Sequence, residues 1–112
     1  MHGLSSEAQA RQAQLLRKYM ASLPEKRARI GDGWKQLQSS GWSADMLAKL
    51  IIEVHRLAGS AGSYGFEELG AVALTLVGSL KSGAGSPELR RVIGQQITSL
   101  LEALETAATE TS

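Results

Sequence analysis

The chain lacks cysteine and contains only two prolines among its 112 residues. Without cysteine it can form no disulfide and no thiolate metal site, which fits a reducing compartment. No secretory signal is recognisable, because polar residues interrupt any apolar run near the N-terminus. The longest apolar stretch, residues 71–77, is far shorter than the roughly 20 residues that a membrane-spanning helix needs. We therefore expect a cytoplasmic protein without a membrane segment.

Aromatic residues are also few, and neither sign of charge is in excess. Twelve basic and eleven acidic residues are distributed along the whole chain and give a formal net charge of +1. This balance offers no basic patch for nucleic acid, so we expect no nucleic-acid partner. Ala, Leu, Gln, Glu, Lys and Arg dominate instead, a composition that favours helices over strands. A length of 112 residues with 43% hydrophobic residues suits one domain, residues 1–112, with a single core.

Capping residues and apolar periodicity predict five amphipathic helices. Their approximate ranges are 6–23, 24–39, 44–62, 66–80 and 87–106. We expect the first to end before Pro24, because the residue preceding a proline avoids the helical region and proline suits the start of a new helix. The predicted fold is all-α, an antiparallel four-helix bundle with an additional N-terminal helix. Residues 1–4 and 107–112 are expected to be flexible ends.

His55 lies in the third predicted helix, and the only other histidine is His2. Apolar residues at helical spacing define the buried face of this helix: Leu47, Leu50, Ile51, Val54, Leu57, Ala58 and Ala61. At roughly 100° per residue, His55 lies about 110° from the centre of that face, so its ring should emerge at the flank. Two histidines are too few for a metal site, and we expect no metal and no cofactor on this chain.

An almost uncharged stripe shares the flank of the helix with His55. It consists of Ala48, Ile52, Gly59 and Gly62, at positions i−7, i−3, i+4 and i+7. The glycines leave bare backbone beside the imidazole, so that another protein can bring a reactive group to it. Imidazole can then act as a nucleophile through a free ring nitrogen near neutral pH. The alternative is a solvent-facing histidine on a helix whose glycines serve close helix packing.

The segment from His55 to Phe66 resembles the signature of histidine-containing phosphotransfer (HPt) domains. The matching positions are His55, Leu57, Gly59, Ser60, Ala61, Gly65 and Phe66. The family commonly carries a lysine three residues after the histidine, and this chain has Ala58 there. A subset of such domains that reads H-R-L-A-G-S is more similar in this respect.

The resemblance implies a helical bundle in which His55 accepts a phosphoryl group from the aspartyl phosphate of a receiver domain. It also implies that His55 passes this group to another receiver. Such a domain binds no ATP and is a phosphotransfer protein rather than a stand-alone catalyst, and magnesium is expected on the receiver. The predicted partner-binding residues are Ala48, Ile52, Arg56, Gly59 and Gly62. Arg56 and Lys49 would steer an acidic receiver rim, and a monomer is expected.

Two other functions remain open from the sequence. The first is an HPt-like interaction module without phosphotransfer, which the alanine at position 58 would suit. The second is a structural helical dimerisation domain, in which Ile52, Gly59 and Gly62 face another copy of the chain and His55 is incidental.

Overall fold

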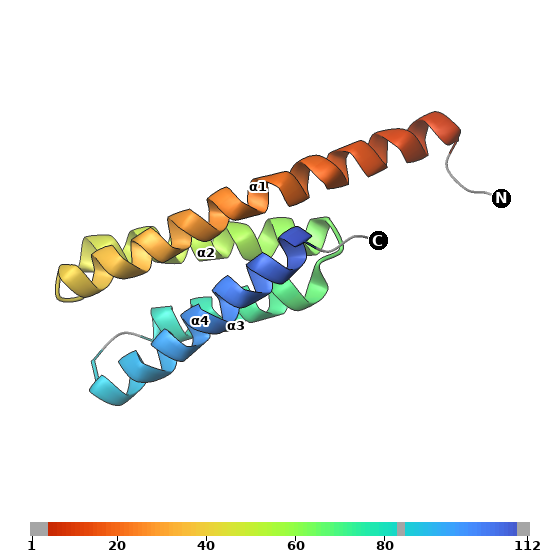
Figure 1. Cartoon of the computed structure of the whole chain (residues 1–112). Helices are drawn as coiled ribbons and strands as arrows, with labels where there is room; N and C mark the ends of the chain where they lie inside the picture. The colour runs from red at the N-terminus through yellow and green to blue at the C-terminus, as the bar shows by residue number, and fades with distance from the viewer. Residues whose placement is uncertain (1–4, 83–84, 110–112) are drawn as a thin grey trace.

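The computed structural model describes residues 5–82 and 85–109. These residues form four α-helices and no strand: α1 (Ser6–Ser39), α2 (Ala44–Ser63), α3 (Glu67–Lys81) and α4 (Pro87–Thr109). Consecutive helices run antiparallel, and each helix packs on two neighbours, α1 on α2 and α4, and α3 on α2 and α4 (Figure 1). The prediction of an all-α helical bundle is confirmed.

The additional N-terminal helix is not present as a separate element, because α1 continues through Pro24. Tyr19 and Leu23 before the proline, and Ile30 and Leu37 after it, lie on one buried face. Their burial on a common core holds the helix straight across a position where proline removes one backbone hydrogen bond. The exposed ring of Pro24 faces solvent rather than the core. The result is one helix of 34 residues whose N-terminal part extends beyond the rest of the bundle (Figure 1).

The core consists of apolar side chains from all four helices, and no polar or charged residue of the described chain is buried. From α2, the helix that carries His55, it takes Leu50, Val54, Leu57 and Ala61. Each fully buried leucine or valine stabilises the fold by about 1.5–3 kcal/mol. These four side chains fix the rotation of α2 about its axis, and they thereby fix the direction in which its other face points.

Serine side chains cap three of the helices at the predicted starts. Ser5, Ser43 and Ser86 accept hydrogen bonds from the backbone amides of Ala8, Met46 and Leu89, at 3.2, 3.2 and 3.1 Å. Each such cap satisfies an amide that has no partner within the helix and contributes about 1 kcal/mol.

The C-terminal helix is longer than the range predicted for it. α4 continues past residue 106 to Thr109, and Ala107 is only 4% exposed. Burial of Ala107 adds a further turn to the packed part of α4. The remaining predicted ends, residues 1–4 and 110–112, lie outside the described residues.

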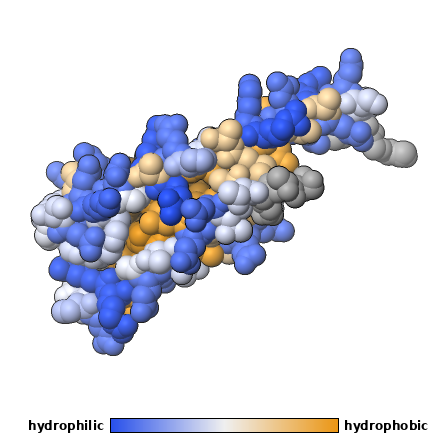
Figure 2. Space-filling model, viewed as in Figure 1, coloured by the Kyte–Doolittle hydropathy of each residue, from blue (hydrophilic) through white to orange (hydrophobic). Residues whose placement is uncertain are grey.

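Hydrophilic residues cover the outer sides of the helices on the face shown in Figure 2, and apolar residues follow the seam between α1 and α4. Leu101, Ala103 and Ala108 of α4 are among the partly buried residues that pack against the core. Within the described ranges, no helix combines the length and the hydropathy required to cross a membrane.

Candidate functional site

His55 projects from the side of α2 that the core leaves free. Val54 and Leu57, its neighbours on the buried face, are 0% and 2% exposed, whereas His55 itself is exposed. Its imidazole makes no hydrogen bond or ion pair with any described residue. Both ring nitrogens are therefore accessible to another molecule.

The histidine borders a groove between α2 and α3, which we call the His55 groove. It is lined by His55, Ala58, Gly59 and Gly62 from α2 and by Glu67, Gly70, Ala71 and Leu74 from α3, and encloses about 470 Å³. Apart from His55, Glu67 is the only described lining residue that can carry a charge. The groove is thus a shallow, largely apolar surface with an accessible imidazole at its edge.

Glycine at position 70 allows α2 and α3 to approach at backbone distance. A Cβ atom placed on Gly70 would lie 3.3 Å from the carbonyl oxygen of Ala58 and 3.5 Å from the amide nitrogen of Gly62. Gly59 and Gly62 differ from Gly70, since a Cβ atom on either would meet nothing within 4 Å. Gly70 therefore serves helix packing, while Gly59 and Gly62 leave the space beside His55 open.

The structure groups only part of the predicted site residues around the groove. Gly59 and Gly62 line it together with His55. Ile52, which is 49% exposed, and Ala48 lie on α2 towards its N-terminus, exposed but outside the groove lining. Arg56 lies elsewhere, on the side of α2 that faces α1.

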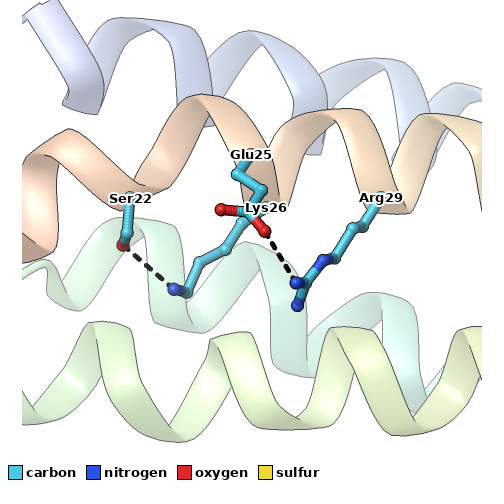
Figure 3. Close-up of polar contacts among 4 residues, drawn as sticks. All are labelled: Ser22, Glu25, Lys26 and Arg29. Atoms are coloured by element: carbon cyan, nitrogen blue, oxygen red, sulfur yellow. Dashed lines mark hydrogen bonds and ion pairs between the residues drawn. The ribbon is translucent and has the colours of Figure 1, made fainter.

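Arg56 belongs to a second depression, between α1 and α2, which we call the basic hollow. It is lined by Lys26, Arg29, Ile30, Glu53, Arg56, Leu57 and Ser60. Two of its cations are held by residues of their own helix: Lys26 donates to Ser22 (3.0 Å) and Arg29 pairs with Glu25 (2.7 Å), as Figure 3 shows. The positive charges near His55 are therefore concentrated on the α1 side of α2, away from the groove.

Leu74 and Glu67 were missed by the sequence reasoning because both come from α3. Leu74 is 59% exposed, the highest exposure among the large hydrophobic residues described. The available signal was its position off the buried stripe of α3, which runs through Leu69, Ala73, Leu76 and Leu80. A leucine that points away from the core beside an exposed histidine enlarges the apolar surface around His55.

Aromatic contacts attach the C-terminal end of α2 to α1. The Tyr19 hydroxyl and the Ser60 hydroxyl share a hydrogen bond of 2.7 Å, and the Tyr19 ring stacks on that of Tyr64 with centroids 4.3 Å apart. The ammonium of Lys26 lies 5.4 Å from the centroid of the Tyr19 ring. Burial raises the pKa of the Tyr19 phenol above its ordinary value of 10.0, although the hydrogen bond to Ser60 opposes this shift. These contacts fix the end of α2 that carries Gly59 and Gly62.

Tyr19→Phe should lower the free energy of unfolding by about 1 kcal/mol, since it removes one hydrogen bond and keeps the ring stack. The raised pKa of Tyr19 adds stability that is fully present below about pH 10 and is lost as the pH rises through the higher pKa of the folded state. Denaturant titrations between pH 8 and about 11 should therefore show a weaker alkaline loss of stability in the variant. Tyr64→Phe is the control for the loss of the hydrogen bond, because the Tyr64 hydroxyl makes none within the described residues. This comparison is made at about pH 8, because Tyr64 also contributes to the raised pKa of Tyr19. Equal stability of wild type and Tyr19→Phe at every pH would contradict this role.

The chain matches the model of one protein family. A family model described as Hpt domain matches residues 14–107, which is most of the sequence and includes His55 and both sides of its groove. Comparison with curated proteins and with solved structures gives no match. The chain thus belongs to the HPt domain family, whose members carry out histidine phosphotransfer in two-component signalling and interact with receiver domains of response regulators.

Proposed function

We propose that His55 is the phosphoryl acceptor of this HPt domain, that it takes the group from the aspartyl phosphate of one receiver domain, and that it passes the group to another. The observation that carries the proposal is the exposure of His55 at the edge of a largely uncharged groove with a backbone floor. An acceptor must be reachable by the active site of a second protein, and neither a core histidine nor one enclosed by bulky neighbours would meet that requirement.

The transfer needs little from this chain beyond a positioned nucleophile. A ring nitrogen of His55 attacks the phosphorus atom while the other nitrogen keeps its proton. A P–N bond forms, the P–O bond to the aspartate of the receiver breaks, and the electron pair of that bond stays on the leaving carboxylate. Phosphoryl transfer depends mainly on alignment and on neutralisation of charge in the transition state. In this proposal the receiver supplies the magnesium ion and most of that charge, and α2 supplies a rigid support for the imidazole.

Exposed apolar residues on both sides of His55 support a docking surface for the receiver. Ile52 of α2 and Leu74 of α3 are 49% and 59% exposed, and the small residues of the groove lie beside them. Apolar anchors around a reactive centre exclude water and favour close approach of a partner. On this surface the receiver would cover α2 and α3 together, with the cations of the basic hollow at its edge.

The proposal is tested with a receiver domain phosphorylated by acetyl phosphate in the presence of Mg²⁺. After it is mixed with the chain, the label should move to the chain and be lost in acid but survive base, as expected of phosphohistidine. Absence of transfer from every receiver of the same cell would favour an interaction module of the same fold without phosphotransfer.

Ala58→Lys should shift the transfer equilibrium towards the phosphorylated chain. Ala58 lines the groove with His55, and no described lining residue provides a cation there. An ammonium within about 6 Å of a phosphoryl group that carries nearly two negative charges should raise the equilibrium constant about three- to tenfold at low salt. Ala58→Gln, of similar length but neutral, is the matched control. The ratio of labelled chain to labelled receiver at equilibrium is the measurement, and an equal ratio in all three proteins would refute the expectation.

A further inference from the structure

The His55 groove carries charge at one end only. Glu67, the first residue of α3, lines the groove with an exposed side chain, and its carboxylate makes no hydrogen bond or ion pair with the described residues. Its neighbours in the groove are glycine, alanine and leucine, apart from His55 itself. A carboxylate without a partner therefore stands at the edge of the surface that a receiver would cover.

The distance of Glu67 from His55 decides what this carboxylate acts on. Gly70 lies between Ala58 and Gly62, because a Cβ atom on it would be 3.3 Å from the Ala58 carbonyl oxygen and 3.5 Å from the Gly62 amide nitrogen. Since α3 runs antiparallel to α2, Glu67, three residues before Gly70, lies further from His55, at about the level of Gly62. Gly62 is seven residues from His55, about 10 Å along the axis of α2. That distance is about one Debye length at 0.1 M salt, so a carboxylate beside Gly62 acts only weakly on a phosphoryl group at His55. It acts instead on the part of a partner that covers Gly59 and Gly62.

We propose that Glu67 is a specificity-determining contact that selects receivers with a lysine or arginine placed about 10 Å from their phosphorylated aspartate. The inference rests on the proposed function and adds the chemistry of the partner surface. Arg56 and Lys26, in the basic hollow, lie on the opposite side of α2. A receiver therefore meets the Glu67 carboxylate over α3 and, on the side of α1, a hollow with three cations and the carboxylate of Glu53. This asymmetry favours one orientation of a receiver with the complementary charges.

Glu68 provides a matched control for the position of Glu67. Both are exposed carboxylates in the first turn of α3, where each interacts favourably with the N-terminal end of the helix. Both carboxylates line a second pocket with Gly65 and Ala103, but only Glu67 also lines the His55 groove. Any effect that arises only from the helix end should be equal in the two variants.

The experiment measures phosphoryl transfer from a receiver that labels the wild-type chain, over a range of chain concentrations. Glu67→Gln should raise KM about two- to fivefold without changing kcat, the range typical of one exposed charge pair. Glu67→Lys should raise KM by about tenfold or more, because it places like charges opposite each other. Glu68→Gln should behave as wild type, and the effects at Glu67 should disappear at 1 M salt, where the Debye length is about 3 Å.

The possible results separate the inference from the function on which it rests. If the receiver labels the wild-type chain at His55 and Glu67→Gln has the wild-type KM, or shares a change with Glu68→Gln, the specificity role is wrong and the transfer function stands. A change in kcat alone would also overturn it, because the carboxylate would then act on the reaction and not on docking. If no receiver labels the chain, the proposed function fails and the inference fails with it.

Discussion

His55→Gln should abolish phosphoryl transfer to the chain completely. Glutamine is close to histidine in size and suits a helix, but its amide nitrogen is not a nucleophile near neutral pH. His55 is exposed and contributes nothing to the core, so the free energy of unfolding should change by no more than about 0.5 kcal/mol. The measurement is the acid-labile label on the chain after incubation with a phosphorylated receiver, together with circular dichroism of the variant.

His2→Gln is the control for this result, because the chain contains only these two histidines. It should be labelled like the wild type. Label that persists in His55→Gln and disappears in His2→Gln would mean that the acceptor has been assigned to the wrong histidine. Loss of label accompanied by loss of helicity would instead give His55 a structural role.

Gly59→Gln should lower the kcat/KM of transfer by at least about tenfold, since a side chain there fills the groove one helical turn from the imidazole. Nothing lies within 4 Å of a Cβ atom at this position, so the chain itself has room for the new side chain. Replacement of glycine within a helix by glutamine should even stabilise the fold, by roughly 0.5–1 kcal/mol. Lower transfer together with equal or higher stability is the expected combination.

Gly31→Gln is the matched control, because Gly31 also lies within a helix and a Cβ atom there would also meet nothing within 4 Å. Gly31 belongs to α1, which does not line the His55 groove. Its substitution should give a similar gain in stability and leave transfer unchanged. Wild-type transfer by Gly59→Gln would show that the receiver does not cover this turn of α2.

Local signals in the sequence predicted where most helices begin. Ser5, Ser43 and Ser86 are caps whose hydrogen bonds reach only three residues ahead, so the sequence contains all the information needed. The prediction that a helix ends before Pro24 was wrong, because contacts with residues distant in the sequence decide whether the helix continues there. A proline in a helix interior costs about 3 kcal/mol, through the lost backbone hydrogen bond and the clash of its ring with the preceding turn, and burial of Leu23 and Ile30 on the same core offsets this cost.

The candidate site was predictable on α2 and not on α3. Helical periodicity within one element shows that His55 leaves the buried face and that the glycines follow it on the same flank. Periodicity also shows that Arg56 lies about 100° from His55 around the axis of α2. In the structure, Arg56 lies on the side of α2 that faces α1. Periodicity does not tell which face of α3 lies beside α2. Leu74 and Glu67 could therefore be assigned to the groove only from the structure, and the functional roles of all these residues remain predictions.

The close approach of α2 and α3 at Gly70 has a consequence for the thermodynamics of docking. The groove floor consists of glycine and alanine, which have no side-chain rotamers to lose when a partner covers them. Most contact surfaces lose about 0.5–1.5 kcal/mol for each flexible side chain that becomes ordered. Within the groove, only His55, Leu74 and Glu67 have side-chain rotamers to lose, so the entropic penalty of covering it should be small. A weak and short-lived complex then needs few favourable contacts, which suits a domain that must bind one receiver, release it and bind the next.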